Sequence, residues 1–223
     1  MTALSAAPRA SATHFSETTR VEAFSDGVFA VAITLLVLEI RVPVPDATQH
    51  GRTLLLALRG LWPSYLGYGL SFVTIGIMWA NHHSIFRYVR RADRYFLIIN
   101  VLFLMCICVL PFPTALLATY LPQPDGRTLA VAVYSGTLVV IALAYNALWW
   151  YAVRGDRLLG SDADRAAIAT ISRRYLAGPL SYGVTVALAF VNVWASLALH
   201  ALLAILYLLP EHRRLGRRQD GLR

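Results

Sequence analysis

The stretch that decides the fold reads RVEAFSDGVFAVAITLLVLEI and runs from Arg20 to Ile40. A charged and polar beginning leads into an almost unbroken apolar run from Gly27 onward. A helix needs about 20 apolar residues, each rising about 1.5 Å, to cross the roughly 30 Å hydrocarbon core of a bilayer. With its flanks this run nearly reaches that length, so it predicts a membrane-spanning helix with Asp26 near one membrane face. A carboxylate there is costly unless it is paired, and we therefore expect Asp26 to have a partner.

The composition is typical of a protein that crosses the membrane several times. Hydrophobic residues make up 57% of the 223 residues, against roughly 45–50% in soluble domains. The formal net charge of +8 is carried by short loops beside apolar runs, where it reports topology and not a nucleic-acid partner. Residues 1–19 lack the apolar centre of a secretory signal peptide and are predicted to be a disordered tail.

Long apolar runs predict an all-α integral membrane protein with six transmembrane helices. The fifth and sixth runs are separated only by Asn192, which requires a tight turn between them. Residues 20–210 form the predicted six-helix domain, and residues 211–223 form a predicted basic cytoplasmic tail. The expected helices are 21–42, 53–84, 94–120, 129–152, 172–191 and 193–210.

The basic residues orient these helices. All 20 of them are arginine. On the six-helix prediction, one side of the membrane receives Arg9, Arg20, Arg87, Arg90, Arg91, Arg94, Arg154, Arg157, Arg165, Arg173, Arg174, Arg213, Arg214, Arg217, Arg218 and Arg223. The other side receives Arg41, Arg52 and Arg127. Because positive loops stay in the cytoplasm, both termini are predicted to be cytoplasmic.

Polar residues of the first two helices are expected to meet at one membrane level. Asp26 begins the first helix, and the second ends in the run Trp79-Ala80-Asn81-His82-His83. A histidine that donates to a carboxylate satisfies both groups and ties two helices together. The candidates for such a buried cluster are Arg20, Ser25, Asp26, Asn81, His82 and His83. The same residue types also suit a proton relay or a metal site, because histidine titrates near neutral pH.

One stripe of the first helix consists of Val31, Thr34, Leu35 and Leu38, at the spacing of a single helical face. Two interpretations are open. The stripe packs against a neighbouring helix, with Thr34 bonded back to its own backbone, or it lines a pore whose apolar constrictions gate by dewetting. Periodicity alone does not choose between them, because both faces of the helix are apolar.

Arg20-x-x-x-Phe24-Ser25-Asp26 and Trp79-x-x-His82-His83 resemble motifs of the transmembrane protein 175 family of potassium channels, in its bacterial form. The resemblance extends through FRYVRRADRY (86–95) and LPFPT (110–114). It implies a six-helix subunit of the bacterial cytoplasmic membrane that assembles as a homotetramer around its first helices. It also implies a permeant potassium ion, no cofactor, and a role for the Arg20, Phe24, Ser25 and Asp26 group in bracing the first helix.

By position, the resemblance implies pore layers at Val31, Thr34, Leu35 and Leu38, with apolar constrictions and a ring of hydroxyl groups in place of a TVGYG filter. Val31 is smaller than the Ile or Leu usual at the innermost constriction.

Two other functions compete with a potassium channel. The first is a proton-conducting or weakly selective cation channel. The second is an integral membrane enzyme that would use His82, His83, Asp26 and Asp93, but the sequence has neither a G-x-S-x-G nor an H-E-x-x-H motif. We therefore expect a channel and no enzyme.

Overall fold

The computed structural model describes residues 17–44, 53–156, 158–160 and 164–208. Within these ranges the secondary-structure elements are all helices. One isolated β-bridge joins Val89 to Leu159. The predicted C-terminal tail, residues 211–223, and most of the predicted N-terminal tail lie outside the described residues.

The first helix, α1, spans Glu17–Leu35 and continues as a tighter 3-10 turn, η1, over Leu36–Glu39. It begins before the predicted residue 21 and ends before residue 42. The tightening precedes the Val42-Pro43 pair, and a residue before proline avoids the α conformation. The amide of Ile40 closes the turn on the carbonyl of Val37, at 3.0 Å. Because side chains three apart eclipse in a 3-10 turn, Leu38 lies nearly above Leu35.

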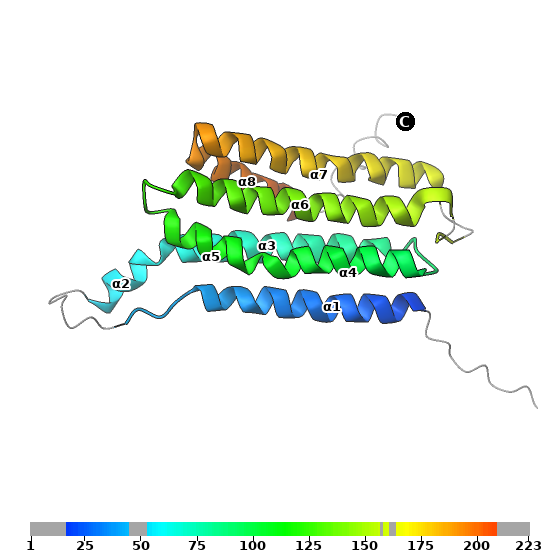
Figure 1. Cartoon of the computed structure of the whole chain (residues 1–223), viewed down its shortest axis with the longest axis horizontal. Helices are drawn as coiled ribbons and strands as arrows, with labels where there is room; N and C mark the ends of the chain where they lie inside the picture. Colours follow the sequence, from blue (N-terminus) through cyan, green and yellow to red (C-terminus); the bar gives the residue numbers. More distant parts are fainter. Residues whose placement is uncertain (1–16, 45–52, 157, 161–163, 209–223) are drawn as a thin grey trace, which may run out of the picture.

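The second predicted helix is two helices. The short α2 spans Leu54–Gly60, and α3 spans Trp62–Ile85. Pro63 follows the break and has no amide hydrogen with which to continue the helical bonding across it. The expectation of one continuous helix over 53–84 is therefore wrong. In Figure 1, α2 extends away from the bundle, and its leucines are exposed.

The third predicted helix is interrupted at Leu110. It consists of α4, Arg94–Val109, and α5, Pro111–Tyr120. Asp93 caps α4 by accepting a hydrogen bond from the amide of Phe96 at 2.8 Å. The interruption follows from Pro111, which cannot donate to the carbonyl of Ile107; the amide of Leu110 bonds that carbonyl instead, at 3.1 Å.

The last three helices are α6, Arg127–Val153, followed by the short turn η2, Arg154–Asp156, then α7, Arg165–Val191, and α8, Val193–Leu208. The helix predicted from residue 172 begins at Arg165 because Asp164 caps it, accepting from the amides of Ala166 and Ala167. The predicted tight turn at Asn192 is confirmed. Its Oδ1 accepts from the amides of Trp194 and Ala195, at 2.9 and 3.1 Å.

The long helices run alongside one another in an elongated bundle, with α1 at one side (Figure 1). The core lies between α3, α4 and α6 and includes the fully buried Tyr134 and Trp149 of α6. The connections after α3 and α6 are tied together: the amide of Arg90 donates to the carbonyl of Leu158 at 2.8 Å. The two connections therefore hold one end of the bundle closed.

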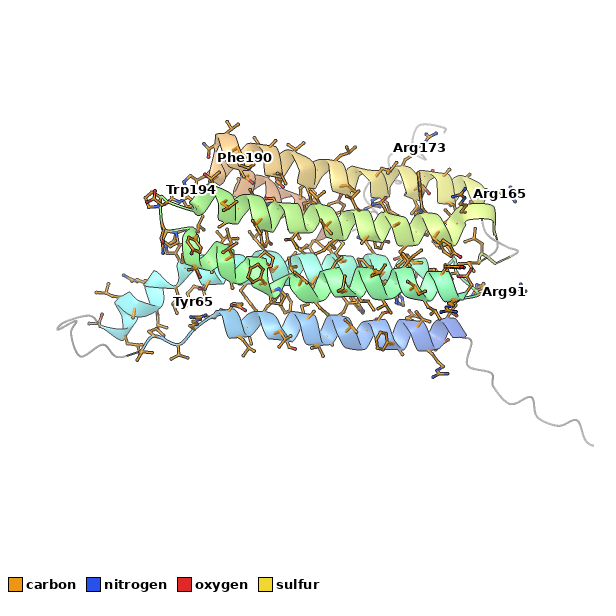
Figure 2. All side chains as sticks on the ribbon, viewed as in Figure 1. Tyr65, Arg91, Arg165, Arg173, Phe190 and Trp194 are labelled. Carbon is orange, nitrogen blue, oxygen red and sulfur yellow. The ribbon has the colours of Figure 1, made fainter. Side chains whose placement is uncertain are left out.

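Three helical segments in the described part are long and apolar enough to cross a membrane: Thr18–Glu39, Arg94–Tyr120 and Arg127–Val153. The shorter α8 is apolar as well. Figure 2 shows Arg91 and Arg165 at one end of the bundle and Tyr65 and Trp194 at the other. Both residue types are enriched where helices leave a bilayer, so their places suit a bundle that stands across one.

Candidate pore helix and its anchor

The two faces of α1 differ sharply in burial. Ser25, Phe29, Ala32 and Leu36 are buried, and they follow one another at helical spacing on the face that packs against α3 and α4. On the other face, 57% of Val31, 42% of Leu35 and 68% of Leu38 are exposed. The rest of the chain therefore contacts the first helix on one side.

Thr34 lies on the exposed face, between Val31 and Leu38. Its Oγ1 is 3.0 Å from the carbonyl oxygen of Ala30 and 2.9 Å from that of Val31, and it donates its proton to this pair. The hydroxyl is thus bonded back to its own helix. A hydroxyl that donates inward keeps its lone pairs directed away from the helix, so Thr34 presents an acceptor oxygen on the exposed face.

A buried chain of polar side chains fixes the inner face of α1. Asn100 of α4 donates from Nδ2 to Ser25 Oγ at 3.0 Å, and Ser25 donates in turn to the carbonyl of Val21 at 2.8 Å. The Oδ1 of Asn100 lies 2.8 Å from Nε2 of His82 on α3. Because Asn100 uses its amide nitrogen on Ser25, His82 must donate from Nε2. One amide therefore ties α1, α3 and α4 together.

The ring of His82 is enclosed by aromatic neighbours. Its centroid lies 5.5 Å from that of Phe29, 5.1 Å from that of Phe86 and 5.7 Å from that of Phe103. Its Nδ1 is buried and has no hydrogen-bond partner among the described residues. With Nε2 as the donor, Nδ1 is an acceptor, which suits a neutral ring packed in an apolar cage.

Asp26 does not pair with a histidine, contrary to expectation. Its Oδ1 accepts from the indole Nε1 of Trp79, at 2.8 Å. His83 pairs instead with Glu22, with 2.6 Å between Nδ1 and Oε1. Glu22 and Asp26 are four residues apart on α1, and Trp79 and His83 are four apart on α3, so the four side chains form two rungs between the helices. They lie in the outer, half-exposed part of the contact.

The remaining motif residues are placed differently. Arg20 and Phe24 are exposed on α1. Asn81 is half-buried, and its main-chain carbonyl accepts a hydrogen bond from the Tyr145 hydroxyl at 3.0 Å. The structure thus brings together Ser25, Asp26, Trp79, His82 and His83, and it joins Asn81 to α6 through the backbone.

Asn100 and Glu22 were missed by the sequence reasoning. Asn100 had a usable signal, because it is the single polar residue between Tyr95 and Cys106. A polar side chain in such a run needs a partner inside the protein. The sequence signal for Glu22 was weaker. Its spacing of four residues from Asp26 places both acids on the same face of the helix.

A crevice of about 290 Å³ lies between α1 and α3, beside Asp26 and Trp79. Apart from the Asp26 carboxylate, its lining is mainly apolar, with Phe29, Ile33 and Ile75 among the residues that line it. In the described part of the chain, no three His, Cys, Asp or Glu side chains are grouped to hold a metal ion. The polar side chains of this region connect α1 to α3 and α4.

An all-helical bundle with apolar helices of membrane-spanning length, and with polar contacts that hold one helix by a single face, fits the class of membrane channels. The model of the family described as endosomal/lysosomal potassium channel TMEM175 matches residues 20–111. A potassium channel of Streptomyces collinus is 48% identical over 192 residues, which cover 86% of this chain and 92% of that protein.

The endosomal/lysosomal proton channel TMEM175 of Gallus gallus is 38% identical over 143 residues, covering 62% of this chain and 28% of that protein. The crystal structure of a lysosomal potassium-selective channel TMEM175 homolog from Chamaesiphon minutus superposes with a TM-score of 0.76 at 46% identity, covering 86% of this chain and 96% of that one. The chain belongs to the TMEM175 family, whose members are ion channels.

Proposed function

We propose that the protein is a potassium-selective channel of a bacterial cytoplasmic membrane, formed by four copies of the chain around their α1 helices. Each copy crosses the membrane six times and keeps both termini in the cytoplasm. The observation that carries the proposal is the exposure of one face of α1, beside the complete burial of Leu36 and near-complete burial of Phe29 on the other face. The naming of the Streptomyces and Chamaesiphon relatives as potassium channels supports it.

The position of α1 in the subunit suits this assembly. It lies at the side of the bundle (Figure 1), so its exposed face is free to meet the same face of other copies around an axis. Closed cyclic assemblies of identical subunits place the same element of every copy around one axis. Val31, Leu35 and Leu38 then form successive apolar layers, which close a pore by excluding water.

Thr34 supplies the polar layer of the proposed pore. Because its proton is donated to the helix, four hydroxyl oxygens directed at the axis present a ring of partial negative charge. Such a ring favours cations over anions and replaces part of the hydration shell that a cation loses in a narrow pore. Selectivity for potassium over sodium then rests on the lower cost of dehydrating the larger ion.

The test compares Thr34→Val with Thr34→Ser. Valine keeps the shape and removes the hydroxyl, whereas serine keeps the hydroxyl. The bi-ionic reversal potential of the purified protein in planar bilayers, with potassium on one side and sodium on the other, should move toward zero for Thr34→Val and stay near the wild-type value for Thr34→Ser. An unchanged reversal potential in Thr34→Val would show that Thr34 does not determine selectivity in the pore.

A second candidate function is proton conduction, which the Gallus gallus relative's name favours. The same bilayer experiment with a pH gradient and symmetric potassium separates the two functions. A reversal potential that follows the proton gradient would support the proton channel. A reversal potential at zero supports the potassium channel.

A further inference from the structure

Pro179 lies inside α7 and leaves one carbonyl of that helix without its usual partner. Proline has no amide hydrogen, so the carbonyl four residues earlier, that of Tyr175, loses its helical bond. Asn146 of α6 replaces the lost bond: its Nδ2 donates to the Tyr175 carbonyl at 3.0 Å. Neighbouring helices commonly satisfy carbonyls that proline frees in a membrane segment. Asn146 therefore clamps α6 to α7 at the carbonyl that Pro179 leaves free.

The clamp fixes the orientation of the Asn146 amide. Its Nδ2 also donates to the carbonyl of Ala142, at 2.8 Å, so both amide hydrogens are used on carbonyl oxygens. An exchange of Oδ1 and Nδ2 would bring three acceptors together, and the assignment is therefore unambiguous. The Oδ1 is buried and has no hydrogen-bond partner among the described residues.

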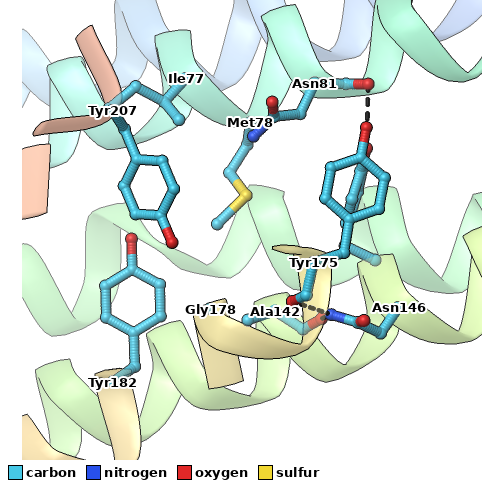
Figure 3. A pocket seen from close by; sticks show the side chains of 10 residues that line it. Ile77, Met78, Asn81, Ala142, Asn146, Tyr175, Gly178, Tyr182 and Tyr207 are labelled. Carbon is cyan, nitrogen blue, oxygen red and sulfur yellow. Dashed lines mark hydrogen bonds between the residues drawn. The ribbon is translucent and has the colours of Figure 1, made fainter. Parts of the chain in front are cut away.

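Asn146 lines a cavity of about 40 Å³ between α3, α6, α7 and α8. Tyrosine side chains surround it. Figure 3 shows Tyr182 and Tyr207, from α7 and α8, with their hydroxyl ends directed at one another beside Met78. The hydroxyl of Tyr145, which also lines the cavity, already donates to the carbonyl of Asn81. No described residue donates to Asn146 Oδ1, and an occupant of the cavity can supply that donor.

The size of the cavity selects the occupant. A water molecule needs roughly 10–15 Å³ of such volume, whereas a cavity that takes up benzene measures roughly 150 Å³. A volume of 40 Å³ thus holds about three water molecules and is too small for an aromatic ligand. Water also supplies both a donor for the amide and acceptors for the tyrosine hydroxyls.

We propose that this cavity is an internal hydration site, in which ordered water donates to Asn146 Oδ1 and bridges to the hydroxyls of Tyr182 and Tyr207. Leaving a buried amide oxygen unpaired is costly, and a bridging water removes that cost. The site lies within one subunit, away from the exposed face of α1. The proposal of a hydration site therefore does not depend on the proposed conduction path.

Radiolytic hydroxyl-radical footprinting of the full-length protein tests the site. X-rays generate the radicals from water in place, so tyrosines beside bound water are oxidised even where bulk solvent does not reach. Tyr134 is the matched control, because it is fully buried and its hydroxyl lies 3.2 Å from Ser71 Oγ. Tyr182, also buried, should be oxidised several-fold faster than Tyr134. Equal rates would overturn the proposal.

A pair of glycine substitutions on α7 sharpens the test. A Cβ added at Gly178, which lines the cavity, would lie 3.8 Å from the Cβ of Ala142, so alanine fits there and takes space from the water. A Cβ at Gly183 would have no atom within 4 Å. Gly178→Ala should lower Tyr182 oxidation, and Gly183→Ala should leave it unchanged. An equal effect of both, or of neither, would count against water in this cavity.

Discussion

At the scale of single residues, Asn100 joins the three helices of the α1 anchor. It is 1% exposed and connects Ser25 with His82 through both ends of its amide. Substitution by the similarly shaped leucine leaves the His82 Nε2 donor buried and unpaired, which costs roughly 1–3 kcal/mol. Asn100→Leu should therefore lower the thermal unfolding temperature of the purified protein in detergent.

Asn81→Leu is the matched control for this prediction, because the contact of Asn81 with Tyr145 is made by its main-chain carbonyl. It should lower the unfolding temperature less than Asn100→Leu. Equal shifts in unfolding temperature for the two variants would mean that the hydrogen bonds of Asn100 add no specific stability.

The sequence correctly predicted that polar residues of the first two membrane helices meet near Asp26. It paired Asp26 with the wrong residue type, a histidine. That Asp26 needs a partner follows from the cost of a carboxylate near lipid. Its partner is Trp79, because the aromatic cage and Asn100 draw His82 to the inner side of the contact. Asn100 is 74 residues beyond Asp26 in the chain, and only the packing of α4 on α1 and α3 brings it there. Local periodicity carries no information on that packing.

At the scale of elements, the exposed stripe of α1 can be compared with an exposed valine on another helix. Val31 belongs to the proposed pore stripe, and Val140 of α6 is 53% exposed. Val31→Ala widens an apolar layer and should raise the resting current of the channel in bilayers several-fold, because wider apolar constrictions stay wet more easily. Val140→Ala should leave the current unchanged. The reverse pattern would assign the pore to a different helix.

The hydrogen bond between Asp26 and Trp79 holds α1 against α3 at its half-exposed edge. Asp26→Asn and Trp79→Phe each weaken this hydrogen bond. Because solvent reaches the contact, we expect each change to cost about 1 kcal/mol of the free energy that holds α1 on α3. Each should lower the tetramer fraction measured by size exclusion with light scattering. The double variant should lower it little further, because both changes remove one contact.

Additive losses in that double variant would show that the two residues act separately. Normal assembly with altered gating in Asp26→Asn would show that Asp26 acts on gating and not on assembly.

Most elements could be predicted from hydropathy, and the misses have physical causes. Hydropathy did not predict the break at Leu61, because leucines continue through it. Gly60 and Pro63, on either side, are the residues that indicate it. The early start of α7 depends on the Asp164 cap in a polar stretch that hydropathy ignores. The 3-10 turn at the end of α1 changes the angle of Leu38, and no apolar pattern reveals such a local tightening.

At the scale of the whole molecule, the distribution of arginine makes a prediction about topology. In a background with Cys106 and Cys108 replaced by alanine, a single cysteine is introduced either at Asp125, in the exposed connection between α5 and α6, or at Arg91. A membrane-impermeant maleimide should modify Asp125→Cys in intact cells and Arg91→Cys only after permeabilisation. The opposite pattern would invert the proposed orientation.

The arrangement of helices around one another was beyond sequence reasoning. Motifs in α1, α3 and the following connection were enough to identify the family, which the Streptomyces collinus and Chamaesiphon minutus proteins confirm. Which helices cover the inner face of α1, and that Tyr145 of α6 supports the end of α3, are results of three-dimensional packing.

The one-residue joint at Asn192 also bears on how the protein is made. With no loop between them, α7 and α8 cannot enter a bilayer separately: Asn192 bonds the first amides of α8, and Ser196 donates to the carbonyl of Thr185 on α7 at 2.8 Å. The 16 described residues of α8 span about 24 Å. We therefore expect the two helices to enter the membrane together, as one hairpin, during biosynthesis.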